Sequence, residues 1–251
     1  MNKRYALTLL TVLIAGSAVI GLPYAIPIVH ATSNTNLFVS AEPSQHNNYF
    51  AGPQVIKVVV VDPDINKLDQ QYGEPFVTVN GKRLRMMQAM DGSWYAYFAD
   101  RNQAIASDKK SSVETRDLNF GVFCGTSGDT FATNLKTGLS FAETMGYTVA
   151  AKVTGSLEGS TVSNPIINSC LAEGGITGAH LEDVVRHYKS INTNPNGFGL
   201  GLNATAISKV WPIIQLYDFS AISSPLTVDY QKSGGDQVVH FTLHSINKFK
   251  K

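Results

Sequence analysis

The chain has 251 residues, with 20 Lys and Arg against 19 Asp and Glu, 43% hydrophobic residues and a formal net charge of +1. This nearly equal number of positive and negative charges gives no electrostatic reason to expect a nucleic-acid partner. Low charge content and abundant glycine favour a β-rich protein, and the length suffices for one large domain or two small ones.

The first 31 residues have the layout of a secretory signal peptide. A short basic start precedes an apolar run without charged residues up to Val29, and small residues stand at the −3 and −1 positions of a cut after Ala31. The run could also span a bilayer of about 30 Å, so an uncleaved signal anchor is the alternative, although two prolines disfavour a continuous helix there. We predict a signal peptide over residues 1–31 and a secreted mature chain over 32–251, with a net charge of −1 and no membrane span.

Strands and tight turns dominate the pattern that follows a polar lead-in over residues 32–52. The run from Gln54 to Val61 predicts a strand buried on both faces. Asn80-Gly81 between two extended runs predicts a hairpin, because both residues tolerate positive φ. A second turn at Asp91-Gly92 leads into another strand. We expect these three strands, which are 76–79, 82–87 and 93–98, to form one meander.

The second half is less regular. Residues 100–115 are polar and predict a loop, and residues 118–124 alternate as a strand does. Residues 125–205 predict a long irregular insertion with one short helix over 181–191, where apolar residues recur at helical spacing. Strands are again expected over 210–217, with Pro212 at an edge or bulge, and over a last hairpin of 226–230 and 237–243.

The count of seven or eight strands predicts an all-β fold, an immunoglobulin-like antiparallel β-sandwich with the insertion between late strands. A division into two domains near residue 105 is the alternative. The two cysteines, Cys124 and Cys170, favour one disulfide in an oxidising compartment. Such a bond would stabilise the fold by about 3 to 4 kcal/mol in the chain-entropy model. Two buried free thiols are the alternative.

Four acids lie within thirteen residues where the first predicted strand meets its loop: Asp62, Asp64, Asp69 and Glu74. Calcium takes six to eight oxygen ligands, and carboxylates at the exit of a strand can converge on one ion. The spacing is not that of an EF-hand loop. The alternative is that Asp62 and Asp64 only shape the turn around Pro63, because Asp side chains bond their own backbone.

Two further motifs bear on function. Asn203-Ala204-Thr205 is an N-glycosylation sequon in a loop-like segment. Gly125-Thr126-Ser127-Gly128 lacks the spacing of a nucleophile elbow, and no other arrangement of residues points to catalysis. The sequence therefore predicts a non-enzymatic protein.

Four stretches together resemble the surface-layer (S-layer) proteins of ammonia-oxidising archaea: VVVVDPDIN, GEPFVTVNGKRLRMMQAMDGSWYAYFADR, VFCG and VWPIIQLYDF. The resemblance runs from about Leu37 to Leu243 and is most specific over residues 73–101. It implies a secreted glycoprotein built of immunoglobulin-like domains that tiles into a lattice around the cell. It also implies calcium at the acidic cluster, with Asp62 and Asp64 as the first ligands. Proteins of this family are usually far longer, which puts assembly by this chain alone in doubt.

These features predict a structural extracellular protein, either an S-layer subunit or a short paralogue that decorates the cell-envelope lattice. Its expected partners are further copies of itself or other S-layer subunits, and its expected cofactor is calcium. The rival prediction is a secreted β-sandwich module that binds carbohydrate or a protein without self-assembly.

Overall fold

The computed structural model describes residues 36–42, 49–51, 53–70, 72–114, 120–126, 138–149, 190–194, 204–208, 210–220 and 225–244. These residues contain twelve strands and two helices. The strands are β1 (Leu37–Glu42), β2 (Tyr49–Ala51), β3 (Val55–Val60), β4 (Phe76–Val79), β5 (Lys82–Leu84), β6 (Met87–Gln88), β7 (Trp94–Asp100), β8 (Val122–Cys124), β9 (Tyr147–Val149), β10 (Ile214–Tyr217), β11 (Leu226–Gln231) and β12 (Gln237–His244). The helices are α2 (Arg101–Glu114) and α5 (Ala204–Ser208). All described residues belong to one unit, Asn34–Lys251.

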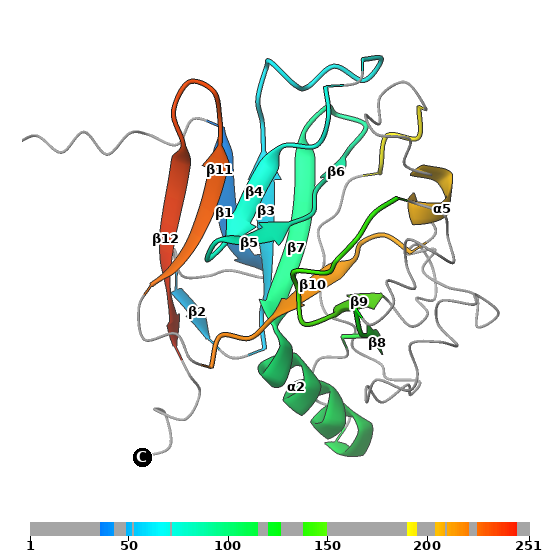
Figure 1. Ribbon diagram of the computed structural model, residues 1–251. Helices are drawn as coiled ribbons and strands as arrows, with labels where there is room; N and C mark the ends of the chain where they lie inside the picture. Colours follow the sequence, from blue (N-terminus) through cyan, green and yellow to red (C-terminus); the bar gives the residue numbers. More distant parts are fainter. Residues whose placement is uncertain are drawn as a thin grey trace, which may run out of the picture. The chain divides into compact units, whose positions relative to one another are not determined.

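The strands form two sheets that face each other (Figure 1). The first sheet has the order β1-β3-β7-β10-β9-β8, with β6 also paired to β7, and the second has the order β2-β12-β11-β4-β5. Most neighbours are antiparallel, whereas β10 pairs with β7 and β12 with β2 in parallel. The predicted all-β, sandwich-like architecture is thereby confirmed. The immunoglobulin-like label is not confirmed by this strand order.

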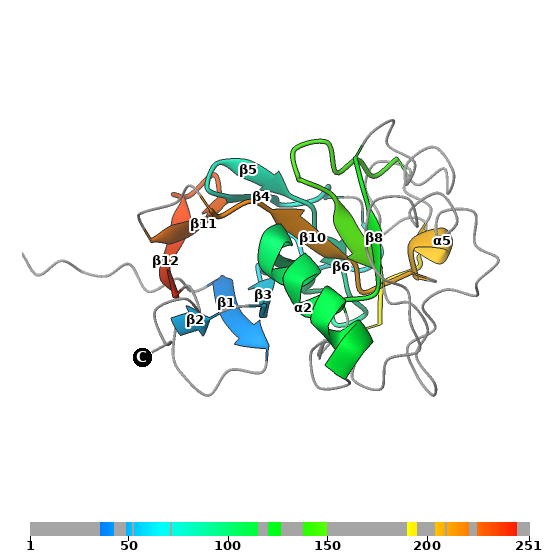
Figure 2. The same cartoon turned by 90° about the horizontal axis from the view of Figure 1, so that it is seen from below.

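The first sheet carries an apolar cluster on each of its faces, which gives the molecule two apolar cores. Along β7, Trp94, Ala96 and Phe98 face the second sheet. They belong to the cluster of buried residues between the two sheets, which we call the inter-sheet core. The alternate residues, such as Tyr95 and Tyr97, belong to a second cluster, the outer core, which also includes Ala104 of α2 and Ile207 of α5. Figure 2 shows α2 on the side of the first sheet away from β4 and β5. The period of two along a strand produces this division.

The strand β3 follows the same rule. Ile56, Val58 and Val60 contribute to the inter-sheet core, while Val55 and the partly buried Val59 pack in the outer core. The face toward the second sheet is buried throughout, whereas the other face is buried at Val55 and only partly at Lys57 and Val59, so the predicted burial on both faces holds only in part. Fully burying each such side chain stabilises the fold by about 1.5 to 3 kcal/mol before entropy is considered.

The predicted hairpin at Asn80-Gly81 is confirmed, with φ of 49° and 77° at the two residues. The turn at Asp91-Gly92 is also present, and Gly92 has a φ of 85°. The single meander is wrong, however, because β4 and β5 belong to the second sheet and β6 and β7 to the first. The chain changes sheets just after β5, where Leu84 and Met86 are both buried in the inter-sheet core.

Two segments expected to be irregular carry regular structure. Residues 100–115, predicted as a loop, form α2, and the Asp100 carboxylate accepts the N–H of Gln103 at 2.8 Å as an N-cap does. Ala104 anchors the helix in the outer core. The segment over 32–52, predicted as a polar lead-in, contains β1 and β2. β1 belongs to the first sheet because its apolar residues Leu37 and Ala41 pack in the inter-sheet core.

The later strands differ in length from the prediction. Within residues 120–126, which the structure describes, the strand expected over 118–124 covers only β8, and the strand expected over 210–217 begins at Ile214, after Pro212. β9 lies within the predicted insertion and pairs with both β8 and β10, so part of that segment belongs to the first sheet. The helix predicted over 181–191 lies almost entirely outside the described residues, which resume at residue 190. The last hairpin, β11 and β12, is confirmed.

Candidate functional site

The acidic loop after β3 is centred on a buried carboxylate. Asp62 is only 1% exposed, although it directly follows the exposed Val61. Its Oδ2 accepts the hydroxyl of Tyr230 at 2.7 Å, and its Oδ1 accepts the backbone N–H of Asp64 at 3.0 Å. The Nζ of Lys232 lies 2.9 Å from one oxygen and 2.8 Å from the other. Asp62 therefore links the β3–β4 loop to the end of β11.

Lys232 acts as an internal cation for two carboxylates. Its Nζ also lies 3.2 Å from Oδ2 of Asp64, whose side chain is 77% exposed. Burial alone would raise the pKa of Asp62, but hydrogen bonds from Lys232, Tyr230 and the Asp64 amide, with the charge of Lys232, lower that pKa below its usual value. The pKa of Lys232 is raised, chiefly by its hydrogen bond to Asp62. The pair is thus held ionised.

Buried amides fix the rest of this loop. The Nδ2 of Asn192 donates to the Leu68 carbonyl at 3.1 Å and to Oε1 of Gln88 at 2.9 Å. Gln88 in turn donates to the Lys67 carbonyl at 3.2 Å, and the indole N–H of Trp94 donates to the Ile65 carbonyl at 3.1 Å. Gln88 and Asn192 are 1% and 2% exposed. The loop is therefore tied to the first sheet by side chains that are far away in sequence.

The four predicted calcium ligands are not brought together. Asp62 and Asp64 share Lys232, Asp69 is exposed, and Glu74 belongs to a different network of arginines. Within the residues that the structure describes, no three His, Cys, Asp or Glu side chains form a group that could hold a metal ion. A calcium ion bound by Asp62 and Asp64 would have to displace the Lys232 ammonium. The turn around Pro63, with the Asp64 N–H bonded to Asp62, matches the alternative interpretation of these acids.

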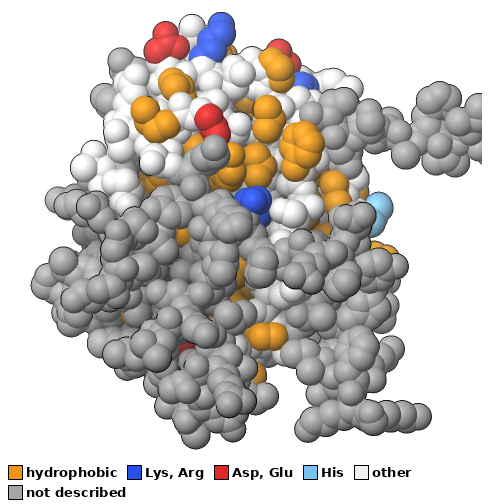
Figure 3. Space-filling view, turned by 180° about the vertical axis from the view of Figure 1, so that it is seen from behind, with side chains coloured by type: hydrophobic (Ala, Val, Ile, Leu, Met, Phe, Trp, Pro, Cys, Tyr) orange, Lys and Arg blue, Asp and Glu red, His pale blue; other side chains and the backbone are white. Residues whose placement is uncertain are grey.

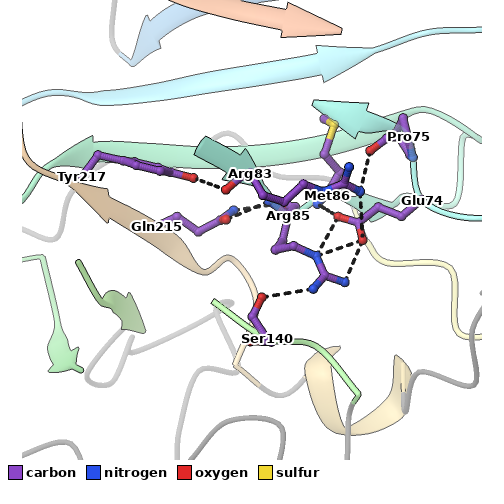
Figure 4. A network of polar contacts seen from close by, with 8 residues as sticks. All are labelled: Glu74, Pro75, Arg83, Arg85, Met86, Ser140, Gln215 and Tyr217. Atoms are coloured by element: carbon purple, nitrogen blue, oxygen red, sulfur yellow. Dashed lines mark hydrogen bonds and ion pairs between the residues drawn. The ribbon is translucent and has the colours of Figure 1, made fainter. Parts of the chain in front are cut away.

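Glu74 is the centre of the second polar cluster (Figure 4). The Glu74 side chain is 3% exposed. Its Oε1 and Oε2 accept hydrogen bonds from Nε of Arg85 at 3.1 and 2.9 Å, and its Oε2 lies 2.8 Å from Nη2 of Arg85. It also accepts the backbone N–H of Met86 at 2.6 Å, and Nη2 of Arg83 lies 3.5 Å away. The guanidinium of Arg83 lies 4.2 Å from the centre of the Phe76 ring. Burial lowers the pKa of Arg83, against the opposing effect of Glu74.

The same cluster closes the edge of the second sheet at β5. The two-residue turn places the N–H and C=O of Arg83 on the side away from β4. The Arg83 N–H donates to Oε2 of Glu143 at 2.6 Å, and its C=O accepts the hydroxyl of Tyr217 at 2.7 Å. Just beyond β5, Gln215 mimics a strand: its Oε1 accepts the Arg85 N–H at 2.8 Å and its Nε2 donates to the Arg85 C=O at 2.7 Å. Side chains thus satisfy all four outward backbone groups.

A hollow of about 120 Å³ lies beside this edge and is lined by Arg83, Arg85, Ser140, Phe141, Ala142 and Glu143. Both arginines already bind Glu74, and Nη1 of Arg85 donates to the Ser140 carbonyl at 3.0 Å. Glu74 offsets part of this positive charge, and the bond from Arg85 to Ser140 joins the segment after β5 to the loop before β9. Phe76 stands next to Arg83 and is 47% exposed.

The remaining predicted residues are only partly described. Cys124 is buried at the end of β8 and is not a free thiol. Cys170 and Asn203 lie outside the described residues, so the Cys124–Cys170 pairing and the glycosylation stay predictions. Among the described residues, no helix is long and apolar enough to cross a membrane.

Sequence reasoning did not identify Gln215, Tyr230 or Lys232 as partners of the two clusters. Their contacts join positions more than 100 residues apart, which no local pattern reveals. Arg83 and Arg85 were within reach, because they alternate on the predicted strand over 82–87, which lies close to Glu74 in sequence. A comparison with known protein families finds no match to this chain, and a comparison with curated proteins finds none either.

Proposed function

We propose that this chain is a structural protein of an extracellular surface layer, either a lattice subunit or a short paralogue that decorates the lattice. The observation that carries the proposal is that the two buried acids, Asp62 and Glu74, are both paired with cations inside the fold. Asp62 is paired with Lys232 and Glu74 with Arg85, and each pair ties elements that are distant in sequence. Buried ion pairs of this kind hold distant segments in fixed positions, as a repeating subunit of a surface layer requires.

Three further arguments support the proposal. The first 31 residues have the layout of a signal peptide, which would direct the chain out of the cytoplasm. The resemblance over residues 73–101 is to proteins that tile cell surfaces. A disulfide between Cys124 and Cys170 and a glycan at Asn203 both belong to the extracellular setting of this proposal.

Calcium enters the proposal as an external cation that competes with Lys232 for Asp62 and Asp64. Binding there would free the Lys232 ammonium and loosen the contact between the β3–β4 loop and β11. The test is to purify the mature chain, residues 32–251, and to follow particle size and electron micrographs while calcium is added and then chelated. Ordered sheets or calcium-dependent oligomers support a lattice subunit, and Asp64→Asn should then weaken the response. If the chain stays monomeric with and without calcium, both the calcium site and assembly by this chain alone are refuted.

A second candidate is an extracellular module that binds carbohydrate. It is favoured by Phe76, an exposed aromatic ring that Arg83 holds in place beside the hollow near β5. Aromatic faces and adjacent polar groups are suited to sugar rings. Calorimetric titration with neutral disaccharides tests this candidate: heat that disappears in Phe76→Ala and persists in Phe38→Ala, an equally exposed phenylalanine of the other sheet, would favour it over the lattice.

A further inference from the structure

The hollow beside β5 has the size of a single side chain. Its volume of about 120 Å³ is well below the roughly 300 to 1,000 Å³ of pockets that enclose drug-sized ligands. The buried Phe141, whose ring centre lies 4.7 Å from that of Tyr147, supplies an apolar part of the lining. Ala142 and Glu143 also line the hollow and are exposed, so it can be reached from outside.

Arg85 indicates which kind of side chain the hollow suits. Glu74 binds its Nε and Nη2, and the Ser140 carbonyl binds its Nη1 at 3.0 Å. The N–H groups of a guanidinium lie in its plane, so these bonds engage the edge of the group and leave its flat faces for packing. A guanidinium face packs well on an aromatic ring, as Arg83 does on Phe76 at 4.2 Å. The hollow therefore suits an aromatic ring better than an anion.

Phe38 of β1 is the most exposed aromatic side chain among the described residues, at 51%. It lies opposite Val59, which packs on the outer core, so the Phe38 ring is on the face of the first sheet away from the inter-sheet core. Figure 3, seen from the side away from β4 and β5, shows hydrophobic side chains exposed on the described part of this face. Figure 2 shows β1 and β5 on opposite sides of the described fold. Phe38 therefore cannot reach the hollow of its own copy.

The other exposed aromatic rings of the described residues already have cationic neighbours. Phe76 lies against Arg83, on the same side of the molecule as the hollow. The ring centre of Tyr72 lies 6.0 Å from Nζ of Lys67. Phe38 is thus the ring that a second copy can best present to the hollow.

The charges near the two surfaces are complementary. Lys57 lies opposite Ser40 in the register of β1 with β3, and so it shares the outer face with Phe38. Glu143 places an exposed acidic residue at the hollow. Opposite charges on two surfaces favour their encounter and fix their relative orientation.

We propose that Phe38 of one copy inserts into the hollow beside β5 of the next copy, where its ring packs against Arg85 and Phe141. The inference rests on the proposed function and names the contact by which copies would join. Because the ring and the hollow lie on opposite sides of the molecule, one pair of copies cannot make the contact twice. Each added copy leaves one ring and one hollow free, so this heterologous contact builds a row of copies, as a lattice requires.

The test measures the sedimentation of the mature wild-type chain and of four variants over a range of concentrations. Phe38→Ala removes the ring, and Ala142→Gln adds bulk without charge at the hollow; each should weaken association by at least tenfold. Met90→Ala and Ala106→Gln are the matched controls, because Met90 is 54% exposed and Ala106 is an exposed alanine of α2; each should change association by less than twofold. All four positions are exposed, and circular dichroism with thermal unfolding establishes that each variant is folded.

A mixture of Phe38→Ala and Ala142→Gln distinguishes this contact from a symmetric one. The first variant keeps its hollow and the second keeps its ring, so the two together can make one contact and no more. The mixture should form dimers that do not grow with concentration. Each of these variants alone should stay monomeric, whereas the wild type should form larger species as its concentration rises.

The outcomes separate the inference from the function on which it rests. Dimers that appear in the mixture and not in either variant alone support the contact, even if no ordered lattice forms. Association that both variants keep, that the controls lose equally, or that the mixture does not recover overturns the contact and leaves the surface-layer proposal standing. A wild-type chain that stays monomeric up to its solubility limit overturns both the contact and assembly by this chain alone.

Discussion

Replacing Gln215 by Leu removes the side chain that completes the edge of β5. Gln215 is 2% exposed and makes two bonds to the backbone of Arg85, at 2.8 and 2.7 Å. A hydrogen bond contributes about 1 kcal/mol net, and a buried group left unpaired costs about 1 to 3 kcal/mol. Because the two Arg85 groups are only partly buried, we expect a loss of about 3 kcal/mol in the free energy of unfolding.

Urea-induced unfolding followed by circular dichroism measures this loss, and thermal unfolding should show a Tm lower by about 6 to 12 °C for a chain of this size. Gln231→Leu is the matched control, because Gln231 is an exposed glutamine on β11; its unfolding free energy should change by no more than about 0.5 kcal/mol. If Gln215→Leu loses less than about 1 kcal/mol, or no more than the control, then the side-chain closure of β5 does not stabilise the fold as we argue.

Three other substitutions probe the turn, the acidic loop and the core. Gly92→Ala should destabilise the protein by at least about 1 kcal/mol more than Gly81→Ala in urea unfolding, because both residues have positive φ but only at Gly92 would a Cβ meet a backbone oxygen, 2.2 Å away. The pKa of Asp62 in the folded protein is below its ordinary value of 3.8, so its contribution to the free energy of unfolding is complete above pH 3.8 and is lost as the pH falls through the folded pKa. Asp62→Asn should therefore flatten the decline in unfolding free energy between pH 5 and pH 2. An unchanged decline would refute the role of this carboxylate. Phe98→Ala, at a site that is 0% exposed, should cost about 3 to 5 kcal/mol, and a cost below 1 kcal/mol would mean that the inter-sheet core is not packed as described.

Local patterns in the sequence predicted the elements that local chemistry determines. The hairpin at Asn80-Gly81 follows from two residues that accept positive φ, and the burial of β3 follows from its run of valines. The helix α2 was missed because its apolar residues are few, although Asp100 and Gln103 have the spacing of an N-cap and its N3 partner. Assignment of strands to sheets was beyond reach, since β4 pairs with β11 and β7 with β10 across more than 100 residues.

The acidic cluster illustrates the same limit. Four acids in one short segment suggested a common ligand, because the sequence does not show which cations approach them. Lys232 lies 170 residues from Asp62, and it occupies the position where an external ion would be expected. Glu74 was separable in principle, because Arg83 and Arg85 both belong to the predicted strand over 82–87, and two alternate positions of one strand share a face.

The pairing of β4 with β11 has a consequence for how the protein is made. The second sheet joins residues 76–79 to residues 228–231, and β10 completes the first sheet beside β7. During synthesis, β3 and β7 can pair early, but both sheets lack a central strand until nearly the whole chain has left the ribosome. Contacts this distant slow folding, because a long loop must close before they form. The nascent chain therefore stays open for most of its synthesis, and an open chain is the form that the export we propose would require.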